Sequence, residues 1–255
     1  MIWLIILIFA ILIIIWVVLM KKLTRNHLHD DNINIPEPEF KPLNLSKTSS
    51  TAPETRPAKP NTMTLKEMAE NDCWCNNYSV PCYIAYDLET TGLNSETCEI
   101  IEIAAVKVEY HKIVDTFQEL IKPKNKIPKK ITSITGITNE MVENCRSIED
   151  VLPEFIKFTE KYPMVAHNAD FDYSFIKKNY LDLYGKNFSR RHYDTIRKYK
   201  QYYQGTGMKP DSCKLGDVIF DILGLEYYFD VYSKNSHRAL TDATALYYIF
   251  EIINK

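Results

Sequence analysis

The pattern of apolar and polar residues divides the 255-residue chain into three parts, and the first is continuously apolar. Residues 2–20 are nineteen consecutive apolar residues, and a helix of that length spans about 28 Å, close to the thickness of a bilayer core. No basic residue precedes this run and no small-residue cleavage site ends it, so we expect a retained signal anchor rather than a cleaved signal peptide. Lys21, Lys22 and Arg25 follow the run, so the positive-inside rule predicts a single-pass protein with the rest of the chain in the cytoplasm.

The second part, residues 21–80, is polar and shows no periodic apolar face. Such a composition predicts an extended, largely disordered tether, with a turn or two of helix at 64–69. Its prolines include Pro36, Pro38, Pro42, Pro53, Pro57 and Pro60.

In the third part, residues 81–255, apolar residues recur with the periods of strands and helices, which predicts a folded domain. Strands are expected near 82–88, 99–109, 112–121, 163–166 and 191–195, with a hairpin at 110–111. Helices are expected after Ser147, whose partner Asp150 completes a capping pattern, and over 171–184, 214–223 and 238–253. Strands followed by alternating helices and strands predict an α/β fold with a mixed five-stranded sheet flanked by helices.

Charge and cysteine content narrow the functional classes only slightly. The net charge of −2 and the pI of about 6.3 give no overall attraction to nucleic acid, so a basic surface would have to be local. The six cysteines lack the spacing of a zinc ribbon or a disulfide scaffold, which favours reduced thiols. Cys73, Cys75 and Cys82 have no fourth ligand at ordinary spacing, so we do not assign them a metal.

Two acids stand at the end of the first predicted strand. Asp87 and Glu89 are two residues apart, so on a strand both side chains point to the same face. Two adjacent carboxylates repel each other unless a cation neutralises them, and Mg²⁺ or Mn²⁺ is the natural occupant. A solvated strand end is the simpler explanation for these two acids alone.

Acids on core-facing helix positions strengthen the metal hypothesis. Asp172 shares a helix face with Phe175 and Ile176, and Asp242 borders the apolar stripe of the last helix. A structural salt bridge would explain either acid alone, whereas a shared cation explains both. His237 is five residues before Asp242, so both can face one site only if His237 lies in the entering loop. There it would suit general-base chemistry.

Three segments containing these residues resemble a known family. YDLETTGLN (86–94), AHNADFD (166–172) and HRALTDA (237–243) are similar to the exonuclease motifs of the DEDD superfamily, histidine subtype, which includes the proofreading epsilon subunit of bacterial DNA polymerase III. The resemblance covers about residues 82–254 and includes KITSITGIT (130–138) and KLGDVIFDILG (214–224).

The resemblance implies a ribonuclease H-like fold and hydrolysis from the 3′ end of DNA or RNA, giving nucleoside 5′-monophosphates. It implies that Asp87, Glu89, Asp172 and Asp242 hold two Mg²⁺ or Mn²⁺ ions about 4 Å apart and that His237 is the general base. The implied substrate-binding residues are Thr90, Thr91, Leu93 and Asn168, to which we add Arg197 and Lys198 from a basic stretch interleaved with tyrosines. A second basic stretch runs from Lys122 to Lys130.

Other functional classes fit less well. Nothing in the sequence forms a glycine-rich phosphate loop or a serine hydrolase signature. A membrane-tethered binding or scaffold module on an inactive nuclease fold is the alternative from another class, although all four acids and the histidine are present. An exoribonuclease acting only on RNA is a further alternative. The expected partners are single-stranded or frayed 3′ ends and a membrane, and a polymerase or repair partner stays open.

Overall fold

The computed structural model describes residues 80–160, 162–204 and 209–254. Within these residues lies a five-stranded sheet with the order β3-β2-β1-β4-β5. The strands are β1 (Cys82–Thr90), β2 (Ile100–Glu109), β3 (Lys112–Leu120), β4 (Met164–Ala166) and β5 (His192–Asp194). β1 pairs antiparallel with β2 and parallel with β4, so the predicted mixed sheet is confirmed.

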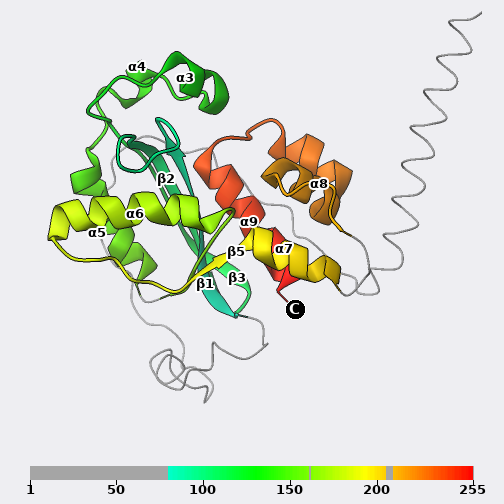
Figure 1. The fold of residues 1–255 in the computed structure, drawn as a ribbon. Helices are drawn as coiled ribbons and strands as arrows, with labels where there is room; N and C mark the ends of the chain where they lie inside the picture. The colour runs from blue at the N-terminus through cyan, green and yellow to red at the C-terminus, as the bar shows by residue number, and fades with distance from the viewer. Residues whose placement is uncertain (1–79, 161, 205–208, 255) are drawn as a thin grey trace, which may run out of the picture. The chain divides into compact units, whose positions relative to one another are not determined.

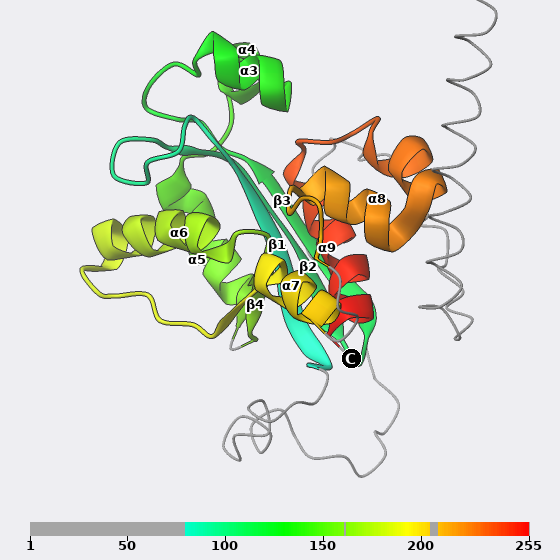
Figure 2. The same cartoon turned by 45° about the vertical axis from the view of Figure 1, so that its right-hand side comes forward.

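The helices cover both faces of this sheet (Figures 1 and 2). In chain order they are α3 (Lys129–Thr135), α4 (Asn139–Val142), α5 (Ile148–Thr159), α6 (Ala169–Tyr184), α7 (Thr195–Gln204), α8 (Leu215–Glu226), the π-helix η1 (Tyr227–Tyr232) and α9 (Ala239–Ile253). Helices α5 and α6 lie on one face, while α9 lies on the other with α7 and α8 beside it.

β1 is buried on both faces, which explains its nearly continuous apolar run. Its even-numbered residues, such as Ile84 and Tyr86, join the core beneath α5 and α6. Its odd-numbered residues Tyr83 and Ala85 pack against α9. The alternation continues to the end of the strand, so the side chains of Asp87 and Glu89 point toward α9.

Several local signals act as the sequence predicts. Ser147 and Asp150 form the capping box that starts α5. Gly185 ends α6 in the left-handed conformation, with φ of 63°. Tyr110 and His111 both have positive φ, 51° and 64°, as the two central residues of a type I′ hairpin require.

Other elements differ from the expectation. The sequence patterns did not predict α3, α4, α7 and η1, and α6 begins at Ala169 rather than 171. Helices α3 and α4 are short. Val142 of α4 and Ile137, which lies between the two helices, pack with Ile101 and Ile127 in a small core of their own. Because these residues are far apart in the chain, their packing produces no periodic pattern of apolar residues in the sequence.

Among the residues for which the structure gives positions, no helix is long and apolar enough to span a membrane. The predicted anchor (2–20) and tether (21–80, apart from Val80) lie outside them. Both stay predictions.

Candidate active site

Asp87 and Glu89 lie where β1 leaves the core. Opposite Asp87 in the antiparallel register is Ala104, and opposite Glu89 is Glu102. The register shifts between Glu89 and Thr90, so the strand is irregular directly after the second acid, and Thr90 then pairs with Ile100.

Asp172 reaches the same strand end from α6. The β1–β4 pairing described for this sheet ends at Ala85 and Val165, so the N–H of Leu88 needs another acceptor. It donates to Asp172 Oδ1 at 3.2 Å, and Asp172 is only 2% exposed. The start of α6 therefore continues the hydrogen bonding that β4 no longer supplies, and this places Asp172 beside Asp87.

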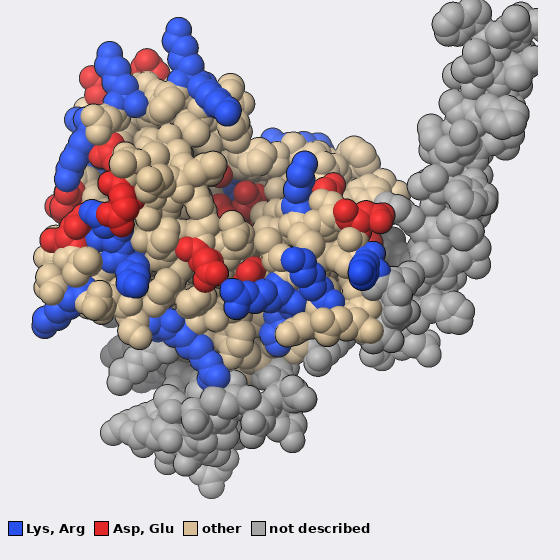
Figure 3. Space-filling model, viewed as in Figure 1, with Lys and Arg blue, Asp and Glu red and all other residues tan. Residues whose placement is uncertain are grey.

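The last two site residues, His237 and Asp242, lie just before α9 and in its first turn. The ligand atoms of Glu89, His237 and Asp242 all lie within 4.8 Å of one another. His237 is exposed, has φ of 61° and stands in the turn before α9, so the loop position required by its spacing from Asp242 is observed. Asp242 is buried, 5% exposed, in the first turn of the helix. In Figure 3 a hollow containing acidic side chains lies between the lobe of α3 and α4 and helix α8.

Four acids lie close together at this site, and their ionised forms are unfavourable without a cation. Burial, followed by repulsion from Asp242 and Glu102, raises the pKa of Glu89 to about 9. Burial also raises the pKa of Asp172 to about 8 and that of Asp242 to about 7, and it holds the pKa of Asp87 well above its usual range. Glu89 and Asp172 would therefore be largely protonated at neutral pH, and Asp242 about half protonated, unless positive charge were supplied.

The donor set fits a divalent metal. Two carboxylates and an imidazole, those of Glu89, Asp242 and His237, lie within 4.8 Å of one another. Asp87 is near enough to Asp242, Asp172 and Glu89 for their charges to raise its pKa. Oxygen-rich sets of this kind suit Mg²⁺ or Mn²⁺. Asp242 Oδ1 is buried and has no hydrogen-bond partner among the described residues. Buried carboxylate oxygens are normally paired, so this atom is explained if it is a metal ligand.

The turn after Glu89 is held by its own hydroxyl groups. Thr90 Oγ1 donates to the carbonyl of Gly92 at 2.7 Å, and Thr91 Oγ1 accepts from the N–H of Glu99 at 2.9 Å. Both hydroxyls that we expected to bind substrate thus shape the turn. Leu93 at its tip is 86% exposed, which leaves its side chain free for contact with a base.

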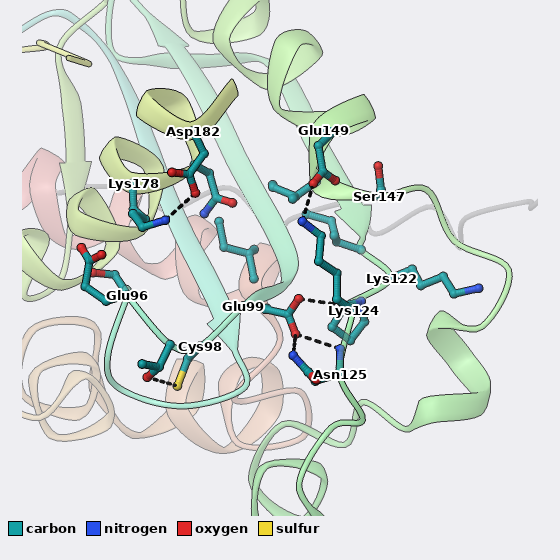
Figure 4. Close-up of a pocket in the computed structure, with 17 residues that line it drawn as sticks. Glu96, Cys98, Glu99, Lys122, Lys124, Asn125, Ser147, Glu149, Lys178 and Asp182 are labelled. Atoms are coloured by element: carbon teal, nitrogen blue, oxygen red, sulfur yellow. Dashed lines mark hydrogen bonds and ion pairs between the residues drawn. The ribbon is translucent and has the colours of Figure 1, made fainter. Parts of the chain in front are cut away.

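The loop that follows this turn, residues 95–99, lines a cavity of about 200 Å³ (Figure 4). Four of the charged groups in this cavity form ion pairs, because Lys124 contacts Glu149 at 2.8 Å and Lys178 contacts Asp182. Glu99 accepts from the N–H groups of Lys124 and Asn125. The contacts of Glu99 therefore hold the loop at 122–125, and Glu149 neutralises Lys124 of the predicted basic stretch.

His167 and Asn168 precede α6. Asn168 is exposed with φ of 59°, and its N–H donates to Asp194 Oδ1 at 3.1 Å. The His167 ring lies 2.8 Å from Thr195 Oγ1 and 2.7 Å from the carbonyl oxygen of Cys213, and burial lowers its pKa. His167 ties three segments together, while Asn168 is accessible.

Helix α7 carries the second basic stretch. Arg197 contacts Asp170 at 3.2 Å and Asp194 at 3.7 Å, so part of its charge is already balanced. Lys198 lies 5.9 Å from the ring centre of Tyr193. Tyr199, one of the tyrosines interleaved with this stretch, is 3% exposed and donates to Asp221 at 2.7 Å, so its ring is not available for stacking on a base.

The sequence patterns missed two groups beside the acids. Glu102 is fully buried and bonded to Arg238, and a hydrogen bond with Tyr232 opposes the rise in the pKa of Asp242. An acid within the otherwise apolar segment Ile100–Val106 was a visible signal for Glu102.

Comparison with known proteins then identifies the domain. Residues 84–250 match the family RNase_T, described as Exonuclease. The chain belongs to this exonuclease family. It is 42% identical over 168 residues to the PolC-type DNA polymerase III of Thermotoga maritima and 36% identical over 168 residues to the epsilon subunit of DNA polymerase III of Aquifex aeolicus. Each match covers 66% of this chain, but 11% of the PolC-type protein and 78% of the epsilon subunit.

Solved structures of exonucleases share the fold. Exonuclease X, solved in complex with 5′ overhanging duplex DNA, is 25% identical, with a TM-score of 0.50 over 68% of this chain and 91% of that chain. A 3′-exonuclease that recognises the histone mRNA stem-loop has a TM-score of 0.56 at 20% identity, covering 74% of this chain and 70% of that chain. The fold is therefore ribonuclease H-like, as expected, and this exonuclease family depends on divalent metal ions.

Proposed function

We propose that this protein is a two-metal-ion 3′–5′ exonuclease that removes nucleotides from the 3′ end of DNA and releases nucleoside 5′-monophosphates. The observation that carries the proposal is the convergence of Glu89, His237 and Asp242 within 4.8 Å, with Asp87 on the same face of β1. These residues come from separate segments, and a purely structural role leaves the crowding of acids unexplained.

Each residue has a role in the proposal. Asp87, Glu89, Asp172 and Asp242 hold the two divalent ions, Mg²⁺ or Mn²⁺, which would stabilise the attacking and leaving oxygens. A water oxygen forms a bond to the phosphorus of the last phosphodiester, and the bond to the 3′ oxygen of the preceding nucleotide breaks. His237 accepts the proton from the attacking water, and its exposed position allows that proton to pass to solvent.

DNA is the proposed substrate because the similar sequences belong to DNA polymerases and exonuclease X was solved with DNA. Thr90, Thr91, Leu93, Asn168, Arg197 and Lys198 are the proposed contacts with the 3′-terminal nucleotides. The hydroxyls of Thr90 and Thr91 act through the shape of the turn. The same relatives support a polymerase as a proposed partner, although this chain covers only 11% of the PolC-type protein.

We further propose that residues 2–20 anchor the exonuclease domain to a membrane, with the domain in the cytoplasm. The nineteen apolar residues and the basic residues after them support this. Fractionation of cells making the full-length chain tests it. A membrane fraction resistant to alkaline carbonate is expected, and full-length protein in the soluble fraction would contradict the anchor.

The activity test uses the full-length chain in mild detergent on 5′-labelled single-stranded DNA and RNA of one sequence, with Mg²⁺, Mn²⁺ or EDTA. A ladder that shortens from the 3′ end only with metal is expected, with DNA preferred. Asp87→Asn should abolish it, and His237→Ala should lower the rate about 10²- to 10⁴-fold.

Asp217→Asn is the matched control, because Asp217 is an exposed acid in the first turn of α8. Its activity should equal that of the wild type. Binding of DNA without cleavage under every metal condition would favour the inactive, tethered binding module, and cleavage of RNA alone would favour the exoribonuclease.

A further inference from the structure

Glu102 is an acid inside the sheet that the exonuclease chemistry does not use. It is 0% exposed and lies in β2 directly opposite Glu89 of β1. Opposed residues of an antiparallel pair share a face, so Glu102 points toward the start of α9, as Glu89 does.

Both oxygens of Glu102 accept hydrogen bonds from elements far apart in the chain. Oε1 accepts from Arg238 Nη2 at 2.8 Å and from Gln118 Nε2 at 2.8 Å. Oε2 accepts from Arg238 Nε at 3.1 Å and from the backbone N–H of Ala239 at 3.1 Å. A buried carboxylate is tolerated only when it is paired and hydrogen-bonded, and Glu102 meets both conditions.

The bond to Ala239 gives Glu102 the role of a helix cap. Arg238 is the N-cap residue of α9, and its side chain makes no capping hydrogen bond. The N–H of Ala239, the first residue of the helix, is instead satisfied by a negative charge from the sheet. This arrangement satisfies the free donor and suits the helix dipole.

Arg238 and Ala239, the two residues of this segment that Glu102 binds, lie between His237 and Asp242 in the chain. The N–H of Asp242 donates to the carbonyl oxygen of Arg238 at 3.1 Å. His237 precedes Arg238 and has φ of 61°, a conformation that a non-glycine residue keeps only when its surroundings impose it. The position of Arg238 therefore sets the positions of both site residues.

We propose that Glu102 and Arg238 are positioning residues, a latch that locks the start of α9 to β2 and so holds His237 and Asp242 against Glu89. This inference rests on the proposed exonuclease function for its kinetic readout. Its second readout, metal affinity, does not depend on catalysis.

Glu251 provides a matched control at the opposite end of the same helix. It accepts from Tyr83 of β1 at 2.8 Å and contacts His111 at 2.8 Å. Like Glu102, it therefore ties α9 to the sheet by a carboxylate, but it touches none of the four acids or His237 in the described contacts. Glu251→Ala removes a comparable tie without disturbing the proposed latch.

The experiment compares Glu102→Ala, Glu102→Gln, Arg238→Lys and Glu251→Ala in the full-length chain. Four quantities are measured: the melting temperature, kcat and KM on a single-stranded oligodeoxynucleotide, and Mn²⁺ affinity by calorimetry without nucleic acid. Glu102→Ala should lower kcat about 10- to 100-fold with KM changed by less than about 3-fold, and it should weaken Mn²⁺ binding about 10-fold. Glu102→Gln keeps one acceptor oxygen and should recover part of both losses.

Glu251→Ala should lower the melting temperature while kcat and Mn²⁺ affinity stay within about 2-fold of the wild type. If Glu102→Ala fails to fold, Arg238→Lys, which keeps the charge but loses the two-pronged contact, should still show the kinetic loss. Equal kcat and Mn²⁺ affinity in the Glu102 and Glu251 variants would overturn the latch. A wild-type protein without exonuclease activity would refute the proposed function, and the Mn²⁺ titrations would still test the latch.

Discussion

Replacing Asp242 by asparagine should stabilise the metal-free protein while removing its activity. Burial raises the pKa of Asp242 from 3.8 to about 7, so the folded state favours the protonated acid. A carboxyl group with a raised folded-state pKa contributes its full stability below the unfolded value and loses it as the pH rises through the folded value. Above pH 7, ionised Asp242 therefore costs the native state free energy that asparagine does not.

The size of the effect follows from the two pKa values. At about 1.4 kcal/mol for each pH unit between them, the cost reaches roughly 4 kcal/mol at pH 9. At pH 5 only about a third of it applies, because the folded acid is still protonated. For a domain of this size, at about 2 to 4 °C for each kcal/mol, the difference at pH 9 corresponds to a rise in melting temperature of about 8 to 16 °C.

The assay is thermal unfolding of the full-length chain in EDTA at pH 5 and pH 9. Asp217→Asn is the control, and this exposed replacement should change stability by less than about 1 kcal/mol. Adding Mn²⁺ should raise the melting temperature of the wild type but not that of Asp242→Asn, since the variant lacks a ligand. Equal melting temperatures of wild type and Asp242→Asn at pH 9 in EDTA would refute the electrostatic reasoning.

Three further predictions concern the core, the turn and the basic helix. Phe250 is 1% exposed and packs on Tyr83 with ring centres 4.8 Å apart, so Phe250→Ala should cost about 3 to 5 kcal/mol in chemical denaturation, and a smaller loss would mean that the core closes over the cavity. A Cβ at Gly92 would lie 2.6 Å from Cys98 Sγ, so Gly92→Ala should cost about 1 to 2 kcal/mol and Cys98→Ala should recover most of it; no recovery in the double variant would contradict the clash. Replacing both Arg197 and Lys198 by glutamate should reduce the slope of log affinity for single-stranded DNA against log salt concentration by about 1.4, while Lys112→Glu on exposed β3 should leave the slope unchanged. An unchanged slope in the double variant would exclude α7 from the interface.

The sequence by itself determined those parts of the fold that depend on which residues of a single strand or helix face the core. The alternation along β1 placed Asp87 and Glu89 on one face, and the spacing around Asp172 and Asp242 identified core-facing helix positions. It also required His237 to stand in a loop, as observed. Each of these inferences uses residues within a few positions of one another, where periodicity is informative.

Only the tertiary structure decided which distant residues complete the site. Glu102 meets Arg238 across 136 positions in the chain, and Tyr199 of α7 is buried against Asp221 of α8. The sequence shows an acid in an apolar strand and a tyrosine in a basic stretch, but it does not show their partners. Hydrogen bonds and packing between distant segments depend on how the chain folds back on itself, so they leave no pattern in the neighbouring residues.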